Sequence, residues 1–197
     1  MKEILILSLS VLLLLGCASS NEPIVVASLE PSCYFLECTN VHGMVHFQNM
    51  GDGSTEVHVR LTGVPPGEHG VHIYESGECP GNGLNAGRHF NPMGVVHGAP
   101  NRFHHAGDLG NVTADPDGHV RARFTTDSIS LAHGATTNPV GHPLMLTAKA
   151  DDLMSQPSGD AGVPISCGVI HRIDPETQAH RWEHLIVEIL LALASSD

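Results

Sequence analysis

Short runs in which hydrophobic and polar residues alternate recur along most of the chain. They lie at 41–47, 56–61, 70–74, 119–125, 143–149 and 166–171. Alternation with a period of two places every second side chain on one face, which is typical of half-buried strands. Turn signals such as Gly51-Asp52-Gly53 and Asp115-Pro116-Asp117-Gly118 separate the runs. The pattern predicts an all-β fold, either an antiparallel sandwich or a barrel.

Three stretches lack this alternation. The segments 75–110 and 150–165 are long and without periodicity, and loops of that length in a compact domain usually carry function or are held by cross-links or metals. The segment 21–40 contains Pro23 and Pro31 and has no clear pattern. We interpret it as an irregular N-terminal extension.

Residues 1–20 have the pattern of a secretory signal peptide. Lys2 precedes an apolar run from Ile4 to Leu15, and small residues follow it. The run is too short for a membrane span. A bacterial lipoprotein signal, in which Cys17 becomes the lipid-bearing N-terminus, is the alternative. We expect a secreted, extracellular protein.

Charge and histidine content narrow the classes of partner. The 197-residue chain has 9 Lys and Arg against 21 Asp and Glu, a formal net charge of −12. Nucleic-acid binding needs a basic surface for the phosphates, so we expect no nucleic-acid partner. Histidine is the commonest metal ligand, and the 15 His exceed Lys and Arg combined. Divalent metal ions are therefore the expected partners.

Secretion also affects how the cysteines and one sequon are interpreted. Beyond Cys17 the chain has four cysteines, at Cys33, Cys38, Cys79 and Cys167. Oxidising compartments favour disulfides, and three pairings of four thiols are open. A zinc site is the competing interpretation, although no Cys-x-x-Cys spacing is present. The sequon Asn111-Val112-Thr113 predicts glycosylation of Asn111 on an exposed loop in a eukaryotic protein.

The longer loop collects metal-ligand residue types. It contains His89, His97 and His105 and leads to Asp108. Three imidazoles and a carboxylate across about 20 residues can enclose one Zn²⁺, which prefers four such ligands. The alternative on spacing alone is a loop of solvated histidines.

Four segments resemble the copper/zinc superoxide dismutase family in order and content. They are AGRHFNP at 86–92, HAGDLGNVTAD at 105–115, KADDL at 149–153 and CGVI at 167–170. The resemblance implies an eight-stranded antiparallel Greek-key β-barrel over 41–171, with a zinc loop at 75–108 and an electrostatic loop at about 150–165. It also implies one zinc per chain, bound by His89, His97, His105 and Asp108, with His89 shared with copper.

The copper positions depart from the family pattern. The family motif Gly-Phe-His-Val-His stands here as Gly70-Val71-His72-Ile73-Tyr74, so His72 matches the first copper histidine and Tyr74 replaces the second. The last copper histidine falls on Thr147, and the active-site arginine falls on Pro164. Only His72 and His89 remain of four ligands. We expect weak or no copper binding and little dismutase activity, with a Tyr74 phenolate ligand as the alternative.

The resemblance also implies an orienting role for one aspartate and a pairing of the cysteines. Asp151 matches the family aspartate that hydrogen-bonds one copper and one zinc histidine, which here are His72 and His97. Cys167 matches the family disulfide cysteine, and Cys79 lies in the loop segment that carries its partner. Cys33 and Cys38 then remain to close a short local loop.

The tail at 172–197 extends past the family barrel. Its apolar residues recur at helical spacing at Trp182, Leu185, Ile186, Ile189, Leu190 and Leu193. The spacing predicts a C-terminal amphipathic helix too short to span a bilayer. Packing on its own barrel, self-assembly and lipid contact are the open alternatives, and we expect a homo-oligomer.

Three functions follow from these observations. We interpret the chain as a secreted, His-rich, zinc-binding protein without ordinary dismutase activity, used as a metal-binding or carrier protein in body fluid. The missing copper ligands and the tail resemble those of the His-rich plasma proteins of bivalve molluscs. An active extracellular dismutase with unusual copper ligands is one alternative, and a structural or interaction module braced by zinc is the other.

Overall fold

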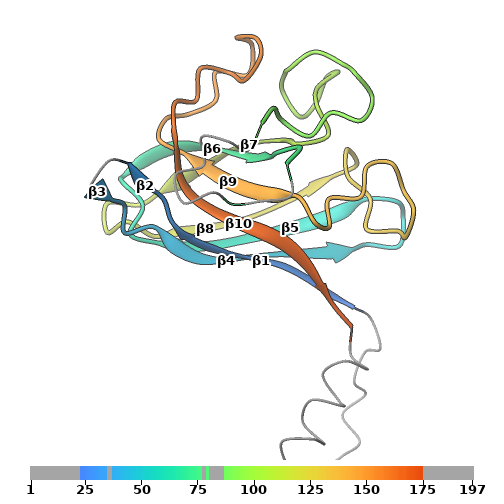
Figure 1. The fold of residues 1–197 in the computed structure, drawn as a ribbon, viewed down its shortest axis with the longest axis horizontal. Coiled ribbons are helices and arrows are strands. Elements are labelled where there is room, and N and C mark those ends of the chain that lie inside the picture. The colour runs from blue at the N-terminus through green and yellow to red at the C-terminus, as the bar shows by residue number, and fades with distance from the viewer. Residues whose placement is uncertain (1–22, 35–36, 77–78, 80–86, 175–197) are drawn as a thin grey trace, which may run out of the picture. The chain divides into compact units, whose positions relative to one another are not determined.

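The structure is a computed structural model that describes residues 23–34, 37–76, 79 and 87–174. Residues Ile24–Ile173 form one compact unit, and the described part of the chain contains ten strands (Figure 1). These are β1 (Ile24–Pro31), β2 (Cys33–Tyr34), β3 (Glu37–Cys38), β4 (His42–Asn49), β5 (Thr55–Thr62), β6 (Gly67–Ile73), β7 (Asp108–Ala114), β8 (Val120–Thr126), β9 (Pro143–Thr147) and β10 (Pro164–Ile173).

Eight of these strands close into an antiparallel barrel. Their order around the barrel is β1, β10, β9, β6, β7, β8, β5 and β4. The chain passes from β5 to β6 and from β8 to β9 without pairing those strands, so two connections cross over neighbouring strands. This arrangement confirms the predicted all-β barrel, and closure leaves the barrel without an open sheet edge.

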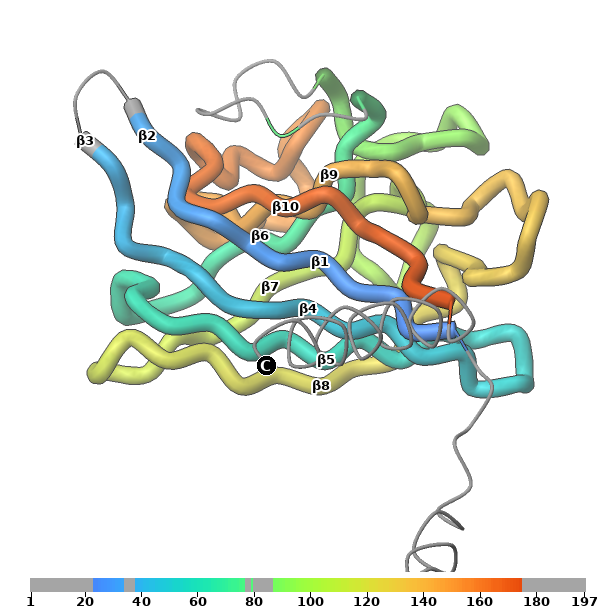
Figure 2. The backbone as a smooth tube through the Cα atoms, turned by 60° about the horizontal axis from the view of Figure 1, so that its bottom comes forward, coloured from blue at the N-terminus to red at the C-terminus, as the bar shows by residue number. Residues whose placement is uncertain are grey.

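The alternation along the strands produces the core. On β4, Val45 and Phe47 are buried, and on β5, Val57 and Val59 are buried. The residues between them, such as His46, lie on the outer face, because successive side chains of a strand point to opposite sides. Figure 2 shows β10, β1, β4, β5 and β8 lying side by side on one wall of the barrel.

The prediction of an irregular extension over 21–40 is wrong for Ile24–Pro31. This segment is β1, which pairs with β10 on one side and with β4 on the other and thereby closes the barrel. Its inward residues Val25, Ala27 and Leu29 are buried. The barrel therefore spans Ile24–Ile173 rather than 41–171. The two prolines misled the interpretation: Pro23 precedes the strand and Pro31 ends it, where proline is tolerated.

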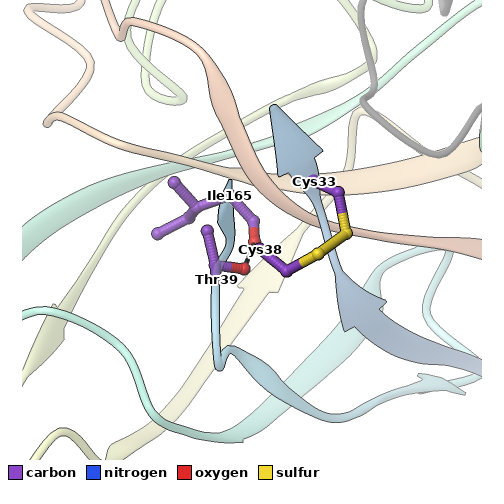
Figure 3. Close-up of a disulfide and its surroundings, with 4 residues drawn as sticks. All are labelled: Cys33, Cys38, Thr39 and Ile165. Carbon is purple, nitrogen blue, oxygen red and sulfur yellow. Dashed lines mark hydrogen bonds between the residues drawn. A yellow bond between two sulfur atoms is a disulfide. The ribbon is translucent and has the colours of Figure 1, made fainter. Parts of the chain in front are cut away.

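A small hairpin follows β1. Strands β2 and β3 pair with each other outside the barrel, with Cys33 opposite Cys38, and a disulfide joins these two residues. Directly after β3, the Thr39 hydroxyl donates to the Ile165 carbonyl at 2.5 Å (Figure 3). The disulfide closes the hairpin, and this hydrogen bond holds its end against the start of β10.

Two predicted segments lie outside the described residues. They are the signal peptide at 1–20 and the helical tail predicted at 172–197, of which only Arg172, Ile173 and Asp174 are described. In the described part of the chain, no helix has the length and apolar character needed to cross a membrane.

Candidate metal centre

The four residues predicted as zinc ligands form one buried cluster. Asp108 is the first residue of β7, and His89, His97 and His105 come from the long loop that precedes it. One ligand atom from each lies within 4.8 Å of the ligand atoms of the other three, and all four side chains are buried. We call these four residues the His–Asp cluster.

The three imidazoles of the His–Asp cluster direct the same nitrogen at Asp108. Asp108 Oδ1 lies 2.7 Å from His89 Nδ1 and 3.2 Å from His105 Nδ1, and Oδ2 lies 3.0 Å from His97 Nδ1. The contact of His97 is close but does not have hydrogen-bond geometry, so its Nδ1 is a buried nitrogen without a hydrogen-bond partner. Converging nitrogen and carboxylate lone pairs of this kind fit a tetrahedral Zn²⁺, which takes histidine and aspartate ligands at about 2.0–2.2 Å.

Burial and hydrogen bonding shift the pKa values of Asp108 and His89 in opposite directions. Burial raises the pKa of Asp108, but the hydrogen bonds with His105 and His89 and the close contact with His97 outweigh it and hold that pKa far below its ordinary value. Burial lowers the pKa of His89 to about 4 and outweighs the hydrogen bond to Asp108. Asp108 is thus ionised and His89 is neutral near neutral pH, which are the protonation states that metal ligands need.

Asp151 connects the His–Asp cluster to the neighbouring copper positions. It lies in the loop between β9 and β10, and its Oδ1 accepts from His97 Nε2 at 2.9 Å while its Oδ2 accepts from His72 Nε2 at 2.8 Å. Both rings are thereby held with Nδ1 directed away from Asp151. Burial lowers the pKa of His97, but the carboxylates of Asp108 and Asp151 outweigh it and raise that pKa to about 9, so a metal bound at Nδ1 would displace a proton. This is the arrangement that the family resemblance implies for Asp151, and a carboxylate behind a ligating histidine typically fixes its tautomer and orientation.

The two retained copper histidines lie face to face. The rings of His72 and His89 stack with their centroids 4.1 Å apart at 21°. His72 Nδ1 and His89 Nε2 are both buried and have no hydrogen-bond partner among the described residues. Two imidazole nitrogens are therefore free of protein hydrogen bonds at this point.

The other copper positions do not add imidazole ligands. Tyr74 meets His89 edge-on with ring centroids 5.0 Å apart. Thr147 is buried, and its hydroxyl lies within hydrogen-bond distance of two backbone carbonyls, at 3.2 Å from Gly70 O and 3.0 Å from Lys149 O. These two positions therefore carry hydroxyl groups rather than imidazoles.

The position of the active-site arginine is also changed. Pro164 is the first residue of β10 and pairs with Thr147, the last residue of β9. Proline carries neither a positive charge nor a backbone N–H. This position therefore carries no cation.

Three further residues hold the site in place, and the sequence did not indicate this role for any of them. The amide of Gln156 forms two hydrogen bonds with the backbone of His97, from His97 N to Oε1 and from Nε2 to His97 O. Gly159 has φ +67°, and a Cβ there would overlap Asp151 Oδ1, so this close approach requires glycine. No spacing or motif marked Gln156 or Gly159.

The third of these residues is Asn111, and the prediction that it lies on an exposed loop is wrong. Asn111 is a half-buried residue of β7. Its Nδ2 donates to Asp151 O at 2.8 Å, and its Oδ1 accepts from Asp151 N at 2.7 Å. A sequon is a three-residue pattern that carries no information on burial. Asn111 anchors the backbone of Asp151.

The structure also shows which cysteines pair. A disulfide links Cys79 of the long loop to Cys167 of β10, in agreement with the pairing implied by the resemblance. Met145 and Tyr74 pack beside this disulfide. The loop is thus tied to the barrel by the disulfide on one side and by the His–Asp cluster on the other.

The comparison with known protein families agrees with this geometry. Residues 41–170 match the family model described as copper/zinc superoxide dismutase (SODC). The match covers the strands from β4 to β10, both long loops and every residue of the candidate centre.

Proposed function

The chain belongs to the copper/zinc superoxide dismutase family, and on this basis we propose that it is a zinc-binding member without ordinary dismutase activity. The observation that carries this proposal is the contrast between two adjacent sets of ligand positions. All four zinc positions hold metal-ligand side chains, whereas only two of the four copper positions do.

The zinc half of the proposal rests on His89, His97, His105 and Asp108. Zinc, when bound there, would supply a closed link between the long loop and β7, of the structural kind that contributes directly to folding. The protein's own residues prepare that link: Asp151 orients His97, and the backbone N–H groups of Gly98 and His105 donate to Asp108 Oδ2 at 3.3 and 2.9 Å.

The loss of activity rests on Tyr74, Thr147 and Pro164. A neutral hydroxyl is a weaker copper ligand than an imidazole, and the Thr147 hydroxyl already lies against backbone carbonyls. The absence of a cation at Pro164, in a chain with a net charge of −12, also removes the local positive field that would steer an anion inward. Copper retention and anion attraction are both reduced.

An active dismutase with unusual copper ligands is the second candidate. It is favoured by the unpartnered His72 Nδ1 and His89 Nε2 and by Tyr74, whose ring contacts His89. In that case Tyr74 would act as a phenolate ligand beside the two imidazoles.

We also propose that the protein is secreted and acts as a metal-binding or carrier protein in an extracellular fluid, like the His-rich plasma proteins of bivalves. The signal-peptide pattern at 1–20, the two disulfides and the 15 histidines support this role. Self-assembly through the apolar stripe of the C-terminal tail belongs to the same proposal.

Metal analysis combined with a dismutase assay tests the proposed function. We expect one zinc per purified chain, weak copper retention after dialysis, and turnover far below that of a family member with four copper histidines measured alongside it. A protein without zinc, or a copper-loaded protein with turnover comparable to that control, would contradict the proposal.

A further inference from the structure

The outer face of β4 and β5 carries a pair of histidines on strands that contain no residue of the metal centre. His46 of β4 and His58 of β5 are direct cross-strand partners in the antiparallel register. Both are half-buried on the outer face, because the flanking residues Val45, Phe47, Val57 and Val59 fill the core. Figure 2 shows β4 and β5 adjacent on the outer wall.

The separation of these two rings is the separation found between metal-site imidazoles in this chain. The ring centroids of His46 and His58 lie 5.8 Å apart at 79°. Within the His–Asp cluster, the three pairs of ring centroids lie 5.5, 5.6 and 5.7 Å apart. The backbone register thus holds the rings of His46 and His58 at a separation close to the separations within the His–Asp cluster.

A carboxylate holds one of the two rings in a ligand-ready state. Glu56, two residues before His58 on the same face of β5, accepts from His58 Nε2 through Oε2 at 2.7 Å. Arg123 of β8 fixes that carboxylate with two hydrogen bonds, Nε to Oε1 at 2.6 Å and Nη2 to Oε2 at 2.8 Å. With Nε2 acting as the donor, His58 Nδ1 keeps its lone pair. A carboxylate behind a ligating imidazole is a recurrent feature of metal sites.

We propose that His46 and His58 form a second metal site, separate from the His–Asp cluster, for a divalent transition-metal ion that prefers imidazole ligands. Glu56 and Arg123 are positioning residues that orient His58, and water completes the coordination. Such a site on the outer barrel wall accepts and releases its ion without opening the buried centre. The proposal does not depend on zinc occupancy or on dismutase activity.

The test is a titration of the full chain with Ni²⁺ as the probe, after its zinc content has been measured. Calorimetry gives the stoichiometry, and paramagnetic broadening of amide signals gives the location. We expect one Ni²⁺ equivalent that broadens the amides around His46 and His58. His46→Ala and His58→Ala should each remove that equivalent, and Glu56→Gln should weaken it by about tenfold.

Matched variants separate this site from other histidines. His133→Ala changes an exposed histidine and should leave the Ni²⁺ equivalent intact. The double variant His180→Ala and His184→Ala changes two histidines of the tail sequence and should also leave the Ni²⁺ equivalent intact. Unchanged zinc content in the His46 and His58 variants shows that they are folded. The proposal would be overturned if the His46 and His58 variants both keep the Ni²⁺ equivalent or if only the tail variant loses it. Absence of Ni²⁺ binding by the natural chain would overturn it as well.

Discussion

Asp151 accepts a hydrogen bond from His97 Nε2 at 2.9 Å, and the opposite nitrogen of the same ring faces Asp108 at 3.0 Å. The imidazole of His97 therefore lies between two buried carboxylates, one from each of two distant parts of the chain. One carboxylate belongs to the metal-ligand set and the other orients the ring. This relationship couples the loop between β9 and β10 to the His–Asp cluster.

Replacing that second carboxylate should weaken zinc binding. In Asp151→Asn one of the two oxygens becomes an amide donor, so His72 and His97 lose one of their two acceptors. We expect zinc affinity to fall about 10- to 100-fold, measured by competition with a chromophoric chelator. Asp152→Asn alters the adjacent exposed carboxylate, which hydrogen-bonds Ser155, and serves as the control. Equal zinc affinity in the natural chain and Asp151→Asn would exclude this role for Asp151.

The two disulfides should differ in their effect on stability. Cys79 and Cys167 are 88 residues apart in sequence, whereas Cys33 and Cys38 are 5 apart. The chain-entropy account of disulfides gives about 4–5 kcal/mol for the long loop and about 2 kcal/mol for the short one. Replacing Cys79 and Cys167 by Ser should therefore lower Tm more than replacing Cys33 and Cys38. Peptide mapping without reduction checks both linkages. A larger decrease in Tm on replacing Cys33 and Cys38 than on replacing Cys79 and Cys167 would contradict the expectation.

Glu56 should make the folding stability of the protein depend on pH in the acidic range. Hydrogen bonds from Arg123 and then His58 lower the pKa of Glu56 from 4.5 to about 2. Because the folded-state pKa is the lower one, the stabilisation is fully present above pH 4.5 and is lost as the pH falls towards 2. In Glu56→Gln that contribution is absent.

The measurement is Tm against pH for both proteins after zinc removal. We expect the Tm gap between the natural chain and Glu56→Gln to be constant above pH 5 and to close as the pH approaches 2. Glu68→Gln, which changes an exposed carboxylate of β6, should show no such closing gap. A gap that widens with acidification would contradict the sign.

The sequence predicted the barrel and the ligand set for identifiable reasons. Alternation on strands such as β4 and β5 is directly visible as a period of two, and the order of His89, His97, His105 and Asp108 matches a specific family pattern. The strand β1 was missed because its inward residues are only Val25, Ala27 and Leu29 and its ends are marked by prolines. Its strand character comes from pairing with β4 and β10, which is a long-range property.

The supporting residues of the site were harder to predict for a similar reason. Asn111 and Asp151 are 40 residues apart, and Gln156 and His97 are 59 apart. Their hydrogen bonds arise only when β7 and the two loops meet in the fold. No local spacing encodes such contacts, and the sequon at Asn111 suggested exposure where the fold requires a half-buried anchor.

The copper positions allow the proposed loss of activity to be reversed by design. His72 Nδ1 and His89 Nε2 are buried without hydrogen-bond partners among the described residues, so they are available to a metal. Tyr74→His together with Thr147→His would add the two imidazoles that the family pattern places beside them. We expect copper content after dialysis to rise to about one per chain, because Cu(II) favours several imidazole ligands. Zinc content and Tm check that the double variant is folded.

Dismutase activity should recover in two stages. The double variant lacks a cation for the anionic substrate, so we expect partial turnover only. Adding Pro164→Arg, beside position 147 across β9 and β10, should raise turnover about tenfold or more, since a local positive field increases anion capture. Pro164→Arg alone is the control and should remain inactive because it does not retain copper. If the copper-loaded natural chain already turns over superoxide as fast as the triple variant, then Tyr74 is a working copper ligand and the protein is an enzyme.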